Sequence, residues 1–375
     1  MTDVISLLRN MIRCPSVTPK EAGILSVLEK TLVPMGFACE RLIYGEGEER
    51  VENLFARKGT GRPHFCFAGH VDVVPAGGEW THPPFGAEIE GGRLYGRGAM
   101  DMKSGVAAFI TALEGFTFEG SVSLLITGNE EGKADYGTPS MLTELAARAE
   151  KWDVCLVGEP SGNDEERQVI KIGRRGSLNA VLNVSGVQGH SAYPEKAVNA
   201  VEVLMDMLTE IRKPLDNGSD AFDPSTLAVT SVDVGNPVSN IIPGQAAARF
   251  NARFNDLHTA DSLDALIRKR IRPIAEQTGV SFDLETECSG NAFVIQDKAF
   301  PKLVADAIEE ITGYRPEEST SGGTSDARFI RHYCPVLESG LVGKGMHGID
   351  ESVAVDDVHQ QVRIYRRILE KFFKK

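Results

Sequence analysis

Acidic and imidazole side chains recur in five short segments spread over most of this 375-residue chain. Three of these segments directly follow apolar runs typical of buried strands, at residues 65–68, 122–127 and 154–157. An unpaired carboxylate is costly to bury at the end of such a strand, whereas a bound metal ion would offset that cost. In sheets flanked by helices, sites form at this edge, so the pattern predicts a single metal site there. The segments are 69–72, 98–103, 129–132, 157–160 and 346–348.

The spacing within the first two segments has a chemical reason. His70 and Asp72 are two residues apart, so on extended backbone their side chains point the same way. Asp72 could therefore hydrogen-bond the second ring nitrogen of a metal-bound His70. The two oxygens of Asp101 could bridge two divalent ions held roughly 3.5–4 Å apart.

The remaining segments complete a ligand set. Glu130 and Glu131 are adjacent, so they cannot face one ion as equivalent ligands, and we expect one ligand and one free base. Glu159 and His347 complete the count. Each segment alone also has an ordinary interpretation: a surface hydrogen bond for His-x-Asp, a solvated face for the glutamate pair and a turn for Glu-Pro. Their shared position at strand ends favours the metal site.

Longer motifs around these residues resemble the dinuclear zinc aminoacylase and carboxypeptidase superfamily. Within it, they resemble the bacterial enzymes that hydrolyse N-succinyl-LL-2,6-diaminopimelate to LL-2,6-diaminopimelate and succinate, in lysine and meso-diaminopimelate biosynthesis. One departure is Asn129, where the pattern usually has an acid. The motifs lie at 64–75, 95–103, 155–161, 173–179, 187–194 and 321–329.

The resemblance implies a mechanism of metal-assisted amide hydrolysis. It implies two Zn²⁺ ions, with Co²⁺ or Mn²⁺ tolerated, that share Asp101 and a water molecule. One ion would be bound by His70 and Glu159 and the other by Glu131 and His347. Zinc lowers the pKa of bound water toward ~7. A cis peptide bond after Asp101 is also implied.

Two further catalytic roles follow from the same resemblance. Glu130 would take the proton of the water and return it to the leaving amine. His190, in the segment Gly189-His190-Ser191, would reach the active site of a partner subunit and stabilise the oxyanion. Without the resemblance, His190 would be interpreted as a helix-entry residue.

The implied substrate carries three carboxylates, and the chain offers arginines that could bind them. The candidates are Arg174, Arg175 and Arg253; any one of them could instead be a solvated surface charge, and for Arg175 alone the two interpretations are equally good. The alternative functions are acetylornithine deacetylase or another aminoacylase or dipeptidase of the same superfamily, and a binding protein that has lost catalysis. The implied substrate-binding residues are Arg174, Ser177, Tyr193, Asn240, Arg253, Gly323 and Thr324.

Composition limits the partners and the location. A formal charge of −13 and a pI near 5.2 argue against nucleic acid, which requires a basic surface. No apolar run approaches the ~18 residues of a membrane span, and the first residues lack the apolar core of a signal peptide. The six cysteines show no C-x-x-C pair, which is typical of reduced thiols. We expect a cytoplasmic enzyme with a small anionic substrate.

The order of predicted elements indicates two domains, one inserted in the other. Residues 1–175 and 289–375 alternate helices and strands, which predicts a catalytic domain with a mixed sheet covered by helices. Residues 176–288 read strand, helix, strand, strand, helix, strand, the ferredoxin-like order. By resemblance, this inserted domain is a lid that forms a homodimer. Its predicted elements span 177–187, 195–211, 227–234, 245–254, 260–277 and 280–287, and helices at 104–116 and from 356 or 357 onward are predicted in the catalytic domain.

Overall fold

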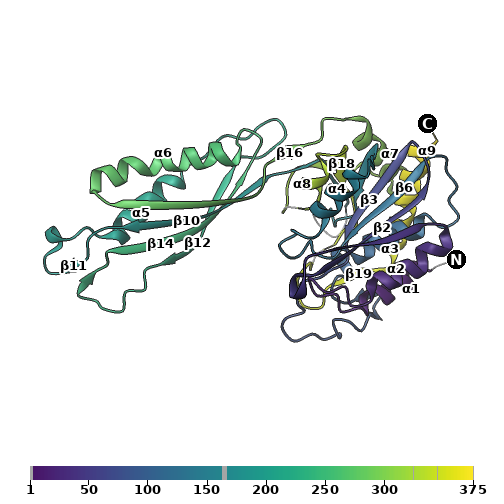
Figure 1. The fold of residues 1–375 in the computed structure, drawn as a ribbon, viewed down its shortest axis with the longest axis horizontal. Helices are drawn as coiled ribbons and strands as arrows, with labels where there is room; N and C mark the ends of the chain where they lie inside the picture. Colours follow the sequence, from purple (N-terminus) through teal and green to yellow (C-terminus); the bar gives the residue numbers. More distant parts are fainter. Residues whose placement is uncertain (1–2, 163–166, 324, 344, 375) are drawn as a thin grey trace. The chain divides into compact units, whose positions relative to one another are not determined.

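The computed structural model describes residues 3–162, 167–323, 325–343 and 345–374. The chain folds into two compact units (Figure 1). Unit 1 comprises Met1–Ile172, Ile295–Ser319 and Ser325–Lys375, and unit 2 comprises Gly173–Val294 and Thr320–Thr324. Unit 1 is therefore assembled from segments on both sides of unit 2 in the sequence. The catalytic and lid roles of the two units stay predictions.

Unit 1 is built on an eight-stranded mixed sheet, as the sequence predicted. The strand order is β1-β2-β6-β3-β7-β18-β8-β17, in which β3 is parallel to both β6 and β7 while β1 and β2 are antiparallel. Its strands are β1 (Ala38–Tyr44), β2 (Val51–Gly59), β3 (His64–His70), β6 (Ser121–Thr127), β7 (Val154–Val157), β8 (Val169–Lys171), β17 (Glu317–Ser319) and β18 (Val336–Glu338). A smaller sheet contains β4 (Glu88–Glu90), β5 (Arg93–Tyr95) and β19 (Ser352–Ala354).

The central strands are buried along their whole length. Every residue of β3, β6 and β7 is buried, because helices cover both faces of the sheet. The rings of Phe67 on β3 and Phe109 stack at 4.1 Å and form part of the core between strand and helix. The helices of unit 1 are α1 (Val4–Ile12), α2 (Ile24–Leu32), α3 (Ser104–Ala112), α4 (Thr138–Ala147), α7 (Ala299–Thr312), α8 (Ala327–Ile330) and α9 (Val355–Phe373).

One helix of unit 1 is shorter than predicted. The prediction extended α3 to residue 116, but the helix ends at Ala112. Gly115 adopts a left-handed backbone conformation (φ +64), which turns the chain away from the helix axis. The predicted start at residue 104 is confirmed.

Unit 2 has the predicted ferredoxin-like architecture. Its antiparallel sheet has the order β12-β14-β10-β15, and α5 and α6 pack on it, with Leu182 and Phe250 of the sheet and Ile267 of α6 in the shared core. A small two-stranded sheet, β11 with β13, lies at the end of unit 2 opposite to β16 (Figure 1). The elements are β9 (Gly173–Arg174), β10 (Gly176–Ser185), β11 (Gly189–His190), α5 (Ala200–Ile211), β12 (Thr226–Asp233), β13 (Ile241–Ile242), β14 (Gln245–Phe254), α6 (Ala260–Thr278), β15 (Ser281–Gly290) and β16 (Phe293–Val294).

The helix predicted from residue 195 begins later. Pro194 opens a separate short turn, after which Ala197 is extended (φ −126, ψ 167). The side chain of Asn199 then accepts the backbone N–H of Val201 and caps α5. Among the described residues, no helix combines the length and the apolar character that a bilayer crossing requires.

Candidate metal centre and substrate-binding residues

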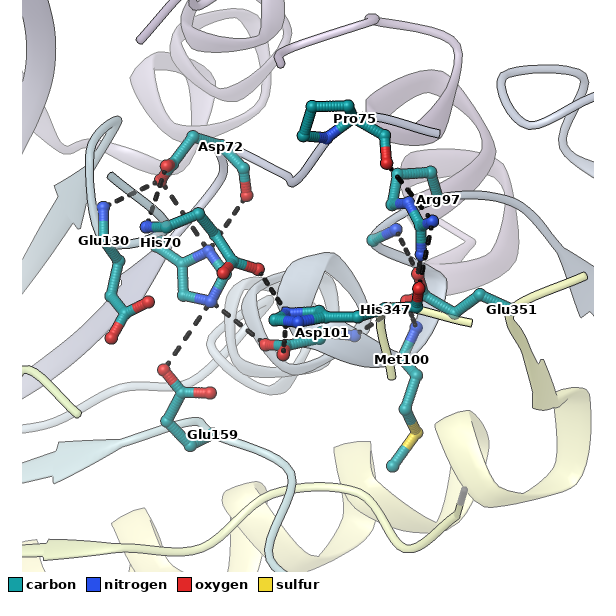
Figure 2. Close-up of polar contacts among 12 residues, drawn as sticks. His70, Asp72, Pro75, Arg97, Met100, Asp101, Glu130, Glu159, His347 and Glu351 are labelled. Atoms are coloured by element: carbon teal, nitrogen blue, oxygen red, sulfur yellow. Dashed lines mark hydrogen bonds and ion pairs between the residues drawn. The ribbon is translucent and has the colours of Figure 1, made fainter. Parts of the chain in front are cut away.

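Three parallel strands bring three of the predicted segments to one edge of the sheet. His70 is the last residue of β3, Glu130 and Glu131 follow the end of β6, and Glu159 follows the end of β7. Because β3 is parallel to both neighbours, the carboxyl ends of all three strands meet. The side chains consequently converge, as the sequence predicted (Figure 2).

Asp101 reaches the same place from an irregular turn, η3 (Ala99–Lys103). Its extended dihedral angles (φ −117, ψ 101) interrupt the turn just before α3 begins. The peptide bond from Asp101 to Met102 is cis, as the resemblance implied. Gly98 opens the turn with φ +78, and a Cβ there would lie 2.5 Å from Cγ1 of Val73, so the turn requires glycine.

The carboxylate of Asp101 lies between two imidazoles. Its Oδ1 is 3.1 Å from Nε2 of His70, and its Oδ2 is 3.4 Å from Nε2 of His347. Oε1 of Glu159 is 3.6 Å from the same atom of His70, and Oε1 of Glu131 is 2.8 Å from that of His347. Each histidine thus has its own glutamate, and the aspartate is shared; Figure 2 shows Glu159 beside His70 and Asp101 close to both His70 and His347. The resemblance implied the same pairing, and the roles of these residues as metal ligands stay predictions.

The donor set fits a divalent metal ion. His70, Asp101 and Glu131 each offer one ligand atom, and these atoms lie within 4.8 Å of one another. Nitrogen from imidazole with oxygen from carboxylate is a ligand combination that zinc and similar ions accept. The geometry therefore supports a metal-binding site at this edge of the sheet.

The charges of the cluster also favour a cation. Burial raises the pKa of Glu130 to about 8, and burial together with the nearby Asp101 raises the pKa of Glu159 well above its usual range. Hydrogen bonds to Asp101 and Glu131 raise the pKa of His347 to about 10. For Asp101, burial opposes ionisation, but the hydrogen bonds from His347 and His70 lower its pKa. A buried group of carboxylates that outnumbers its imidazoles is stabilised when a cation binds.

Asp72 has a different partner from the one predicted. Nδ1 of His70 lies 3.0 Å from the backbone carbonyl oxygen of Asp72 and 3.7 Å from its carboxylate. The carboxylate instead accepts the backbone N–H groups of Glu130 (3.2 Å) and Glu131 (3.1 Å). The predicted side-chain hydrogen bond to His70 is therefore wrong. Asp72 holds the turn that carries both glutamates.

A buried aspartate for which no role was predicted from the sequence, Asp326, also acts on Glu130. Oδ2 of Asp326 accepts a hydrogen bond from the hydroxyl of Thr138 at 2.7 Å. The charge of Asp326 contributes to the raised pKa of Glu130. Asp326 and Glu130 are far apart in sequence, so no local spacing connects them. The position of Asp326 inside the 321–329 motif is the only sequence signal for its role.

Three of the predicted substrate-binding residues lie together in unit 2. Ser177 on β10 pairs with Arg253 on β14, and Arg174 lies three residues before Ser177. Burial, followed by the positive charge of Arg175, lowers the pKa of Arg253. This end of unit 2 therefore concentrates positive charge that an anionic ligand would neutralise.

Two further predicted substrate-binding residues, Tyr193 and Asn240, lie with His190 in a second group at the far end of the same unit. The ring of His190 on β11 lies tilted against that of Tyr193, with centroids 5.9 Å apart, and the N–H of Ser191 donates to the carbonyl oxygen of Asn240 at 3.0 Å. The ten residues of β10 separate the two groups, which is roughly 30 Å of strand. Unit 2 does not bring His190 to Arg174.

The glycine-rich loop at 321–323 contacts Arg174. Nη1 of Arg174 donates to the carbonyl oxygen of Ser321 at 3.2 Å. Gly322 has φ +107, and a Cβ there would lie 2.2 Å from the same nitrogen, so this glycine makes room for the guanidinium. Of the two residues of this loop predicted to bind substrate, Gly323 is exposed and Thr324 lies outside the described residues.

Curated relatives resemble the chain over its whole length. It is 53% identical over 380 residues to the succinyl-diaminopimelate desuccinylase of Rhodospirillum centenum, covering 99% of this chain and 97% of the relative. It is 51% identical over 378 residues to the protein of that name from Parvibaculum lavamentivorans, covering 99% and 96%.

Solved structures and a family match agree with the fold. A Bacillus subtilis protein described as a dinuclear metal binding peptidase from the M20 family superposes with a TM-score of 0.75 at 13% identity, covering 99% of this chain and 98% of that one. Residues 66–371 match peptidase family M20/M25/M40, and this range contains every candidate ligand described above. The chain is a member of peptidase family M20/M25/M40.

Proposed function

We propose that this protein hydrolyses the succinyl amide of N-succinyl-LL-2,6-diaminopimelate, releasing LL-2,6-diaminopimelate and succinate. About half of its residues are identical to those of succinyl-diaminopimelate desuccinylases along the whole chain, which supports this substrate over an acetylated amino acid. The proposed metal-assisted hydrolysis rests on the position of Asp101, whose two carboxylate oxygens each face a different histidine. The reaction belongs to lysine and meso-diaminopimelate biosynthesis. The free state of all six cysteines supports a cytoplasmic location.

Two divalent ions would be held by the residues of this cluster. His70 and Glu159 would hold one, Glu131 and His347 the other, and Asp101 would bridge them. Zinc fits this mixed donor set, and cobalt or manganese would be tolerated. When bound, such a pair of ions supplies Lewis acidity, which makes a water molecule nucleophilic near neutral pH and polarises the amide carbonyl.

Glu130 would move the proton during the reaction. It neighbours Glu131, but its carboxylate is not the one that pairs with His347, so it stays available for proton transfer. Asp72 fixes the turn beneath it through two backbone hydrogen bonds. The carboxylate of Glu130 would accept a proton from the attacking water and return it to the leaving amine.

The basic end of unit 2 would bind the carboxylates of the substrate. Arg174 and Arg253 each present a guanidinium, which can bind a carboxylate through two hydrogen bonds. Ser177 lies opposite Arg253 in the sheet and offers a hydroxyl beside it. A carboxylate placed there would relieve the repulsion between Arg253 and Arg175.

His190 would serve the active site of a second subunit. Within unit 2 it lies at the opposite end of the sheet from Arg174 and Arg253, so the three side chains of one chain cannot bind the same small substrate. A homodimer formed through unit 2 would let His190 and Tyr193 reach the partner's substrate. The imidazole of His190 would donate to the developing oxyanion.

Metal analysis combined with a substrate comparison tests the proposed function. We expect two zinc ions per chain and a catalytic efficiency on succinyl-diaminopimelate at least a hundredfold above that on acetyl-diaminopimelate and acetylornithine. A preference for acetylornithine would identify a deacetylase. Fewer than one bound ion, or no hydrolysis of any of the three substrates, would contradict the metal site itself.

Arginine variants test the substrate contacts. Arg174→Met and Arg253→Met should each lower kcat/KM on succinyl-diaminopimelate by two or more orders of magnitude, because a desolvated carboxylate would lose its charged partner. Zinc content should not change. Arg249→Met is the matched control, since Arg249 lies on the same strand and the same face, four residues from Arg253, and is exposed. An equal loss in the control would mean that these arginines act through general charge only.

A further inference from the structure

A buried ion pair lies beside the candidate metal centre. The guanidinium of Arg97 donates from Nη1 to Oε2 of Glu351 at 2.8 Å, and the two side chains are 2% and 1% exposed (Figure 2). Arg97 precedes Asp101 by four residues, and Glu351 follows His347 by four. Each partner therefore belongs to the loop of one candidate ligand, although the loops are about 250 residues apart in sequence.

Glu351 fixes the backbone of the turn that carries Asp101. Its Oε1 accepts the N–H groups of Met100 (2.8 Å) and Asp101 (3.1 Å). Its Oε2 accepts the N–H of Gly98 (3.0 Å) in addition to Arg97. Both oxygens are thus saturated by groups of the 97–101 segment. A residue from the His347 loop determines where the turn before Asp101 lies.

Arg97 in turn fixes the backbone around His347. Nη1 donates to the carbonyl oxygen of Gly348 at 3.0 Å, and Nη2 donates to that of His347 at 3.3 Å. His347 has a left-handed backbone conformation (φ +61), which a residue with a Cβ keeps only when its surroundings hold it there. Nη2 also donates to the carbonyl oxygen of Ala76 at 2.9 Å, in the loop that follows β3.

The other half of the centre is held differently. His70 is the last residue of β3 and pairs with Thr127 of β6 in the sheet register. Glu159 lies two residues after the end of β7, which is also paired with β3. The register of the sheet positions these two side chains, and the hydrogen bonds of the Arg97–Glu351 pair go to the loops of Asp101 and His347.

We infer that Arg97 and Glu351 are positioning residues that set the distance between the Asp101 carboxylate and the His347 imidazole, and so determine the affinity of the metal ion bound on the His347 side. The inference rests on the metal site of the proposed function. Neither residue would touch the ion or the substrate. Loss of the Arg97–Glu351 pair should weaken the binding of one of the two ions selectively. A general contribution of the pair to folding would not have this effect.

Stepwise zinc binding to the metal-free protein, measured by competition with a chromophoric chelator, tests this inference. In Arg97→Met and in Glu351→Gln, we expect one zinc affinity within threefold of wild type and the other reduced at least tenfold. In a His347→Ala background, adding Arg97→Met should leave the remaining affinity unchanged. Arg97→Lys keeps the charge opposite Glu351 but has fewer donors for the carbonyl oxygens. The zinc affinity of its weakened site should therefore lie between that of wild type and that of Arg97→Met.

The control is Arg57→Met, which removes a partly buried ion pair with Glu150 (2.6 Å) near the opposite edge of the same sheet. It should lower the melting temperature of the metal-free protein and change neither zinc affinity. If Arg97→Met or Glu351→Gln does not fold, Arg97→Lys alone decides the outcome. Two unchanged affinities, or an equal reduction of both, would overturn the inference while leaving the proposed function intact. A wild-type protein that binds no zinc would instead overturn the proposed function.

Discussion

Adjacent residues of this chain have different surroundings and hence different proposed roles. Glu131 pairs with the imidazole of His347 at 2.8 Å, whereas burial raises the pKa of Glu130 to about 8, against the charge of His70 and with the charges of Asp326, Asp72 and Glu131. A buried carboxylate without an imidazole partner within hydrogen-bond distance takes up a proton more readily than a solvated one. This difference distinguishes the proposed base from the proposed ligand.

The first prediction concerns Glu130. Glu130→Gln should keep both metal ions, because every candidate ligand is intact, and should lose about 10²–10⁴-fold in kcat, since the amide cannot accept the proton. Metal content and single-turnover hydrolysis are the measurements. Glu119→Gln, at an exposed position just before β6 and so at the opposite edge of the sheet, serves as the control and should behave as wild type. Near-normal turnover in a metal-replete Glu130→Gln protein would contradict the assignment.

At this scale, the sequence predicted which side chains gather but not all of their partners. The convergence of His70, Glu131 and Glu159 follows from strand ends, which apolar runs make visible in sequence. The hydrogen-bond partners of the Asp72 carboxylate could not be predicted in this way. A spacing of two residues from His70 shows on which side of the strand Asp72 points, but not where the loop that carries Glu130 and Glu131 lies. The ion pair between Arg97 and Glu351 could not be predicted either, since no local pattern connects residues so far apart in sequence.

At the scale of the element, the buried strand β3 carries a histidine at each end. His64, at its start, is 2% exposed; its Nδ1 lies 2.8 Å from the carbonyl oxygen of Lys151 and its Nε2 lies 2.6 Å from the hydroxyl of Ser123. Burial, followed by the charge of Arg57, lowers its pKa from 6.5 to about 4. The imidazole is therefore held neutral in the folded protein.

The second prediction concerns pH and follows from this lowered pKa. Between pH 6.5 and about 4 the unfolded chain binds a proton at His64 that the folded chain does not, so the free energy of unfolding falls as the pH falls through this window. The loss for this single group is at most ~3 kcal/mol. In His64→Gln, which keeps hydrogen-bonding atoms but does not titrate, this loss should be absent.

Urea unfolding followed by tryptophan fluorescence is the measurement, because both tryptophans, Trp80 and Trp152, lie in unit 1. The exposed His359→Gln serves as the control and should give a pH profile parallel to that of wild type. Parallel profiles for wild type and His64→Gln would contradict the prediction.

Elements whose ends depend on local signals were harder to predict than elements with a strong periodic pattern. β14 spans the predicted residues 245–254 because its alternation of buried and exposed positions is regular. α3 and α5 differ from prediction at the end governed by one residue, Gly115 in the first and Asn199 in the second. Periodicity shows that a helix exists, whereas caps decide where it stops.

At the scale of the whole molecule, the insertion of unit 2 into unit 1 separates two sets of candidate residues. The metal-binding cluster belongs to unit 1, and His190 lies on β11 in unit 2. The order of predicted elements was enough to recognise the insertion, because the ferredoxin-like order interrupts a simple alternation. Oligomeric state is not encoded in such an order.

The third prediction tests whether His190 acts across a dimer. His190→Ala and Glu130→Gln should each be inactive alone, and mixing them under conditions of subunit exchange should restore about a quarter of wild-type activity. That fraction is expected because half of the dimers are then mixed and each mixed dimer has one complete site of two. Exchange is verified by mass spectrometry of tagged chains. Proven exchange without activity would mean that His190 acts within its own chain or is structural.

The strand order of unit 1 also has a consequence for the synthesis of the protein. β18 lies between β7 and β8 in the sheet, yet its residues follow the whole of unit 2 in sequence. A nascent chain on the ribosome therefore carries an apolar strand, β7, with one edge open while more than a hundred further residues are translated. Such an edge is a template for pairing with other chains, so each newly made molecule passes through a stage at which chaperones would protect it from aggregation.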